Sequence, residues 1–142
     1  RASRDSDWLS GNAAFASWNT WYDKNNPAYR AIFQNNSFVF QPLASADPAT
    51  CGANCQVLQN SDSAWPVLGV EAGGSNTAFR RFFVLKPICW DSVSQATVTL
   101  AQGQDCSLYN SLAGYQVEST VAWQFGGGWK PVQIIEQLYD WK

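Results

Sequence analysis

The chain has 142 residues, a formal net charge of −2, a sequence pI near 4.8 and 15% aromatic residues. A chain of this length is typical of one domain, and the acidic balance argues against a nucleic-acid surface, which usually carries clustered Lys and Arg. No apolar run approaches the roughly 18 residues that a membrane helix needs, so we expect no membrane span.

The N-terminal part is predicted to be helical. Residues 1–7 are polar and charged, and we interpret them as a loose leader before a single α+β domain over residues 8–142. Six apolar side chains then fall on one stripe at about 100° per residue: Trp8, Ala14, Phe15, Trp18, Trp21 and Tyr22. Pro27 disfavours helical geometry at Asn26, so a second, short helix is expected from there. It would bury Tyr29, Ile32 and Phe33.

Extended segments follow along the chain. Strands are predicted at residues 36–42, 65–74, 76–87 and 94–103, where apolar and polar residues alternate or apolar residues run together. Residues 43–63 are rich in Ala, Ser, Asp and Asn, and we expect a long loop there.

The C-terminal segment has the clearest pattern. Residues 115–125 alternate: one face carries Tyr115, Val117, Val121, Trp123 and Phe125, and the other carries Gln116, Glu118, Thr120 and Gln124. This predicts a half-buried antiparallel strand with its polar face in solvent. A turn is expected at residues 126–128, which are all glycine. The returning strand is apolar on both faces, so it is either covered on both sides or offers a face to a partner.

These elements predict an α+β fold, with N-terminal helices packed on a curved antiparallel sheet of about six strands. The order resembles the nuclear-transport-factor-2-like superfamily. The resemblance rests on the segment "YRAIFQNNSFVF" and on the closing hairpin "YQVESTVAWQF-GGG-WKPVQIIEQLYDW". It implies a cone-shaped fold around a pocket. Members include cyclases, isomerases and dehydratases as well as non-catalytic modules of secretion and transport assemblies. The cysteines and the long loop depart from that pattern.

The four cysteines are Cys51, Cys55, Cys89 and Cys106, and the chain has no histidine. An even count favours disulfides formed in an oxidising compartment, so we expect a secreted protein, extracellular or periplasmic. Free thiols and a metal site are the alternatives, but the second cysteine pair lacks zinc-ligand spacing. Of three connectivities we favour Cys51–Cys55 with Cys89–Cys106. Asn35 begins an N-x-S sequon, which matters only in a eukaryotic source.

Few residues qualify for catalysis, because histidine, the commonest general base, is absent. Glu136 is in phase with Val132 and Ile134, so burial there would raise its pKa and make it an acid or base. Arg81 would pair with it or bind an anion. The competing interpretation is a structural ion pair or a solvent-exposed position. No cofactor and no metal are expected.

The eight tryptophans point instead to binding. Trp65, Trp90 and Trp129 lie near predicted turns or loops, where their rings would be exposed. We expect a non-catalytic binding or assembly module that contacts a protein partner through aromatic surface residues, with a homo-oligomer among the options. A carbohydrate or small-ligand binder is the first alternative. A pocket enzyme of cyclase or isomerase type, using a buried carboxylate, is the second.

Overall fold

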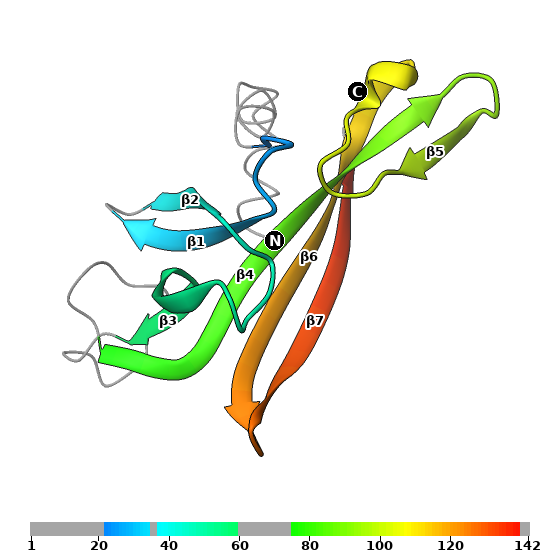
Figure 1. Cartoon of the computed structure of the whole chain (residues 1–142). Helices are drawn as coiled ribbons and strands as arrows, with labels where there is room; N and C mark the ends of the chain where they lie inside the picture. Colours follow the sequence, from blue (N-terminus) through cyan, green and yellow to red (C-terminus); the bar gives the residue numbers. More distant parts are fainter. Residues whose placement is uncertain (1–21, 35–36, 60–74, 140–142) are drawn as a thin grey trace.

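The computed structural model of the chain describes residues 22–34, 37–59 and 75–139, which form an antiparallel sheet of seven strands (Figure 1). In chain order the elements are β1 (Ala28–Gln34), β2 (Ser37–Leu43), η1 (Gly52–Cys55), β3 (Gln56–Gln59), β4 (Ser75–Asp91), β5 (Ala96–Thr99), η2 (Cys106–Leu108), β6 (Ser111–Phe125) and β7 (Gly128–Tyr139). The two η elements are short 3-10 helices. Within the described ranges, no helix has the length and apolar character needed to cross a membrane.

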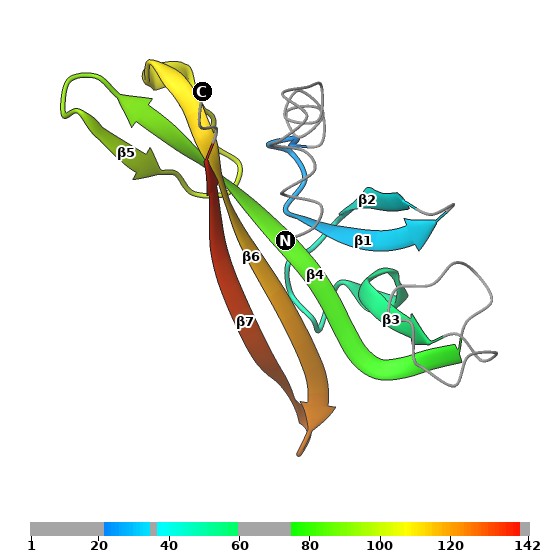
Figure 2. The same ribbon diagram turned by 180° about the vertical axis from the view of Figure 1, so that it is seen from behind.

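Strand β4 organises the sheet. One of its edges pairs with β6, and its other edge takes β3, β1 and β5 in succession. Strand β2 adds outside β1 and β7 adds outside β6, which gives the order β2-β1-β4-β6-β7. Seen from both sides, β4, β6 and β7 form one long twisted ribbon from which the β1–β2 hairpin projects (Figures 1 and 2).

The α+β class predicted from the sequence is wrong. The described residues contain no α-helix, and their sheet has seven strands rather than about six beneath packed helices. The expected leader and nearly all of the expected first helix lie outside the described residues, as does the expected strand at residues 65–74.

The short helix expected from Asn26 is strand β1. It pairs with β2 at each position from Ala28 opposite Leu43 to Gln34 opposite Ser37. The spacing of Tyr29, Ile32 and Phe33 covers barely one helical repeat, and aromatic and β-branched residues over so short a stretch suit a strand equally well. The neighbouring strand β2 supplies hydrogen bonds that a lone helix of this length would lack.

The predicted C-terminal hairpin is confirmed. Strands β6 and β7 pair without a register shift from Phe125 opposite Gly128 to Gly114 opposite Tyr139. Gly126 and Gly127 have φ angles of 60° and 81°. A two-residue turn with positive φ at both positions matches the right-handed twist of the strands, which explains why glycines stand there.

The segment between β2 and β4 crosses one face of β4. The sequence predicted an uninterrupted loop over residues 43–63, but η1 and β3 lie within it. Its disulfide joins Cys51 to Cys55 with 5.8 Å between the Cα atoms. This disulfide is part of a buried cluster, against which Val84 packs. The cluster consists of Ala28, Leu43, Cys51, Cys55 and Phe82. We call this side of β4 and β6 the loop face.

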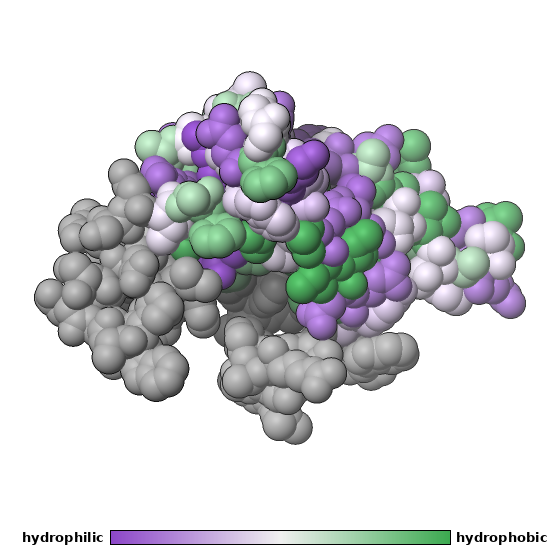
Figure 3. All heavy atoms as spheres, turned by 90° about the horizontal axis from the view of Figure 1, so that it is seen from below, coloured by the Kyte–Doolittle hydropathy of each residue, from purple (hydrophilic) through white to green (hydrophobic). Residues whose placement is uncertain are grey.

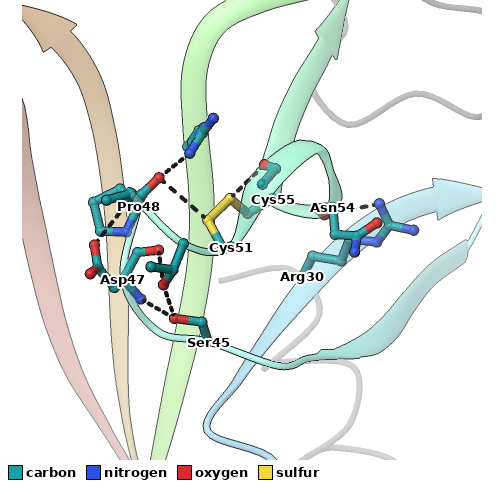
Figure 4. The surroundings of a disulfide bond; sticks show 11 residues. Arg30, Ser45, Asp47, Pro48, Cys51, Asn54 and Cys55 are labelled. Atoms are coloured by element: carbon teal, nitrogen blue, oxygen red, sulfur yellow. Dashed lines mark hydrogen bonds between the residues drawn. A yellow bond between two sulfur atoms is a disulfide. The ribbon is translucent and has the colours of Figure 1, made fainter.

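Two arginines from the sheet hold the disulfide segment in place, as Figure 4 shows. Arg30 on β1 donates from Nη1 to the carbonyl oxygen of Asn54 at 2.9 Å. Arg80 on β4 donates to the carbonyl oxygen of Pro48. The segment is therefore hydrogen-bonded to two different strands, β1 and β4. It cannot move off the loop face without breaking both hydrogen bonds.

The second disulfide joins Cys89 on β4 to Cys106 on η2, with 5.6 Å between the Cα atoms. The four cysteines are therefore paired as the sequence predicted. Disulfides form and persist in oxidising environments, so the pairing indicates an oxidising, extracellular type of compartment.

Candidate functional site

Strand β7 is the longest edge strand of the sheet that the structure describes. Strand β7 pairs with β6 along one edge, and among the described residues no strand pairs with the other. It has 12 residues, whereas the edge strands β3 and β5 have four each. A long edge presents a row of backbone N–H and C=O groups to any chain that can pair with them.

The hairpin register determines which backbone groups point outward. A two-residue turn is closed by a hydrogen-bonded pair, here Phe125 and Gly128, and the pairs then alternate along an antiparallel ladder. Residues in the alternate pairs direct their N–H and C=O groups away from β6. Between Gly128 and Leu138 these residues are Trp129, Pro131, Gln133, Ile135 and Gln137. Pro131 has no N–H, but its N–H would have pointed away from β6, so the proline removes no hydrogen bond between β6 and β7.

Side chains on both faces of this strand are exposed. Every residue from Lys130 to Gln137 is exposed, although several are aliphatic. Val132 is 53% exposed and Ile134 65% exposed on one face, and Ile135 is 54% exposed on the other. Seen from below, the surface of the described residues carries a group of hydrophobic side chains, drawn in green (Figure 3). Exposure on both faces excludes one of the two interpretations of this strand, the one in which β7 is covered on both sides.

Strand β6, by contrast, has buried residues on both faces, including the face that the sequence predicted to be solvent-exposed. Glu118 is 9% and Thr120 6% exposed on that face, while on the predicted core face Tyr115 is 3% and Phe125 70% exposed. The disulfide segment packs over Phe82, which stands opposite Thr120 on this face. Alternation identifies two faces of a strand but not which one receives a cover.

The buried carboxylate of Glu118 belongs to a polar ladder that sequence reasoning missed. Lys86 on β4 forms an ion pair with Glu118. Gln116 donates to the same carboxylate at 2.8 Å, and Gln137 on β7 donates to Gln116 at 3.1 Å. Each polar group is satisfied, so the ladder ties the three strands together rather than offering reactive groups. Only the strand register, which places Lys86, Gln116 and Gln137 in one row, reveals it.

The three tryptophans predicted to bind a ligand are not gathered in one place. Trp65 lies outside the described residues. Trp90 is 38% exposed near the β5 end of β4. Trp129 lies at the opposite end, with the Arg80 guanidinium 4.3 Å above its ring. Arg80, which lies over Trp129, and Trp90 are ten residues apart on β4, so the two tryptophans are roughly 33 Å apart along the strand. A short glycan could not contact both rings.

Around the β6–β7 turn, other aromatic residues are exposed. Phe79 is 45% exposed and packs edge to face against Trp123, with 6.4 Å between ring centroids. Phe125 follows on the same face. These rings continue the apolar surface of Val132 and Ile134 toward the turn, so the exposed patch extends beyond β7 itself.

Glu136 and Arg81, the proposed catalytic pair, are apart. Glu136 is exposed on β7 opposite Val117, and Arg81 on β4 stands opposite Val121, so one strand, β6, and roughly 13 Å along the strand direction separate them. Arg81 instead donates to the carbonyl oxygen of Ala31 at 3.4 Å, and burial lowers the pKa of its guanidinium. Asn35, the sequon residue, lies outside the described residues.

No known protein family, curated protein or solved structure matches this chain. The resemblance to the nuclear-transport-factor-2-like superfamily stays a prediction.

Proposed function

We propose that this chain is a secreted, non-catalytic assembly module that binds a protein partner by adding a strand to the outer edge of β7. The observation that carries the proposal is the combination of an outer edge, from Lys130 to Gln137, with which no other described strand pairs, and exposed aliphatic side chains on both of its faces. In strand addition, backbone hydrogen bonds supply affinity and alternate side chains supply specificity. Strand β7 presents both.

Natural proteins usually protect sheet edges, because open ones aggregate. The other edge strands here follow that rule, since β3 and β5 are short and β2 contains Pro42. In β7, the residues that discourage edge pairing flank the segment from Val132 to Ile135. Lys130 and Pro131 precede this segment and Glu136 follows it. An exposed apolar segment with charged flanks is the usual character of an interaction site.

The two alternatives have less support. The carbohydrate site predicted from the tryptophans is not assembled, because Trp90 and Trp129 stand at opposite ends of the ribbon. An enzyme acting through Glu136 would need a partner residue or a buried carboxylate there, and Glu136 is exposed and distant from Arg81. The disulfides favour a secreted module, with the partner met outside the cytosol.

Site-specific photo-crosslinking tests the proposal. A photoreactive residue replaces Gln133 at the centre of the edge or, as a control, Val93, which is 92% exposed in the turn between β4 and β5. Each photoreactive variant is irradiated in two samples, as purified protein alone and after addition to extracellular fluid from the source organism. We expect position 133 to crosslink to one identified protein, this chain included, and Ile134→Asp to abolish that crosslink. Position 133 yielding no more product than position 93 in either sample overturns the proposal.

A further inference from the structure

We propose that the strand received by β7 is β7 of a second copy of this chain, paired antiparallel about Gln133. This inference rests on the proposed function and identifies its partner. A twofold axis perpendicular to the sheet at Gln133 would join two sheets edge to edge, with the same face of each copy on the same side.

The backbone allows this pairing. Gln133 directs its N–H and C=O groups outward, so a twofold axis there falls on a hydrogen-bonded pair between the two copies. The next outward positions place Ile135 of each copy opposite Pro131 of the other. The Ile135 N–H donates to the Pro131 carbonyl oxygen, and the missing proline N–H removes one hydrogen bond per side. Trp129 then stands opposite Gln137 of the second copy.

The side chains are complementary in the same register. Lys130 stands opposite Glu136 of the second copy, and by symmetry the pair occurs twice. Val132 stands opposite Ile134 of the second copy, also twice. The face thus carries four exposed aliphatic side chains in a central cluster with an opposite-charge pair at each end. Cross-strand pairs of both kinds stabilise antiparallel sheets.

Neighbouring registers lose this complementarity. Centring the axis on Pro131 places Lys130 opposite Val132 and aligns two prolines, which cannot donate to each other. Centring it on Ile135 places Glu136 opposite Ile134. The nearest shifts centre the axis on Val132 or on Ile134, and they place Lys130 opposite Ile134 or Glu136 opposite Val132. The Gln133 register alone among these five opposes both charges to charges and aliphatic residues to aliphatic residues. The other face agrees, because exposed Ile135 then packs beside Pro131 of the second copy.

Charge reversal tests both the partner and the register. Lys130→Glu alone places Glu opposite Glu at both ends of the strand pair, and Glu136→Lys alone places Lys opposite Lys. Each reversal converts two attractions into repulsions, so each variant is expected to dimerise roughly tenfold more weakly. An equimolar mixture restores opposite charges at both ends and is expected to form the heterodimer in preference to either homodimer. The double variant is expected to regain the parent's dimerisation.

Dissociation constants are measured by sedimentation equilibrium, and heterodimer fractions by native mass spectrometry with one variant labelled with nitrogen-15. Val93→Glu and Leu108→Lys serve as controls, because both positions are 92% exposed outside β7 and the substitutions introduce the same charged side chains there. Near-ultraviolet circular dichroism checks that each variant keeps the parent fold. Controls that dimerise like the parent, together with weak single variants and a restored mixture, support the inference.

Other outcomes overturn it. A dimer that neither reversal weakens, or a mixture that does not recover, refutes the register about Gln133. A chain that stays monomeric while position 133 crosslinks to a different protein refutes the second copy as partner and leaves the proposed function standing. A monomeric chain with no crosslink above the control at position 93 refutes both.

Discussion

Strands β6 and β7 are neighbours with 15 and 12 residues, yet they differ in what surrounds them. Strand β6 has β4 on one edge and β7 on the other, and its residue Thr120 stands opposite Phe82, which the disulfide segment covers. Strand β7 has β6 on one edge, and its residues from Lys130 to Gln137 are exposed. The position of a strand in the sheet, rather than its own residues, therefore determines how much of it is buried.

The largest expected effect comes from removing a buried ring beside β6. Phe82 is 3% exposed within the core cluster, so Phe82→Ala is expected to lower the free energy of unfolding by about 3–5 kcal/mol. Ile134→Ala on β7 is the matched substitution, and it should cost about 0.5 kcal/mol or less in the monomer. Urea denaturation of dilute protein measures both. Equal losses at the two positions would mean that β7 is covered as β6 is.

A smaller effect is expected where β7 meets the far end of β6. A Cβ at Gly114 would lie 2.1 Å from the carbonyl oxygen of Leu138, so Gly114→Ala must push the two strands apart. We expect a loss of about 1–3 kcal/mol in the free energy of unfolding, as for other overpacked sites. Gly128→Ala is the control, because a Cβ there meets nothing within 4 Å. A neutral Gly114→Ala would contradict the close approach of these strands.

The C-terminal hairpin and the cysteine pairing were predictable because their signals are local. The glycines at positions 126 and 127 mark a turn between an alternating segment and a second, apolar one, and the distances along the chain between paired cysteines are short. The fold class was not predictable in the same way. Strand β1 is strand because β2 lies beside it, and its seven residues fit a helical spacing equally well.

The candidate site shows the same division. That β7 carries apolar residues on both faces is visible in the sequence, but its exposure depends on its place at the edge of the sheet. The Lys86–Glu118 ion pair joins residues 32 positions apart, so only the pairing of β4 with β6 brings them together. The solvent face assigned to β6 was wrong at Glu118 and Thr120, which are buried, because alternation alone does not show which face of a strand is covered.

Hydrogen exchange of the β7 amides tests the central claim, an open strand-binding edge, most directly. In dilute protein we expect alternation: the N–H groups of Gln133 and Ile135 exchange freely, and those of Val132 and Ile134, bonded to β6, are protected. Raising the protein concentration should protect Gln133 and Ile135 and remove the alternation. Equal protection of all four amides in dilute protein would contradict the account, because the outer edge would then already be paired.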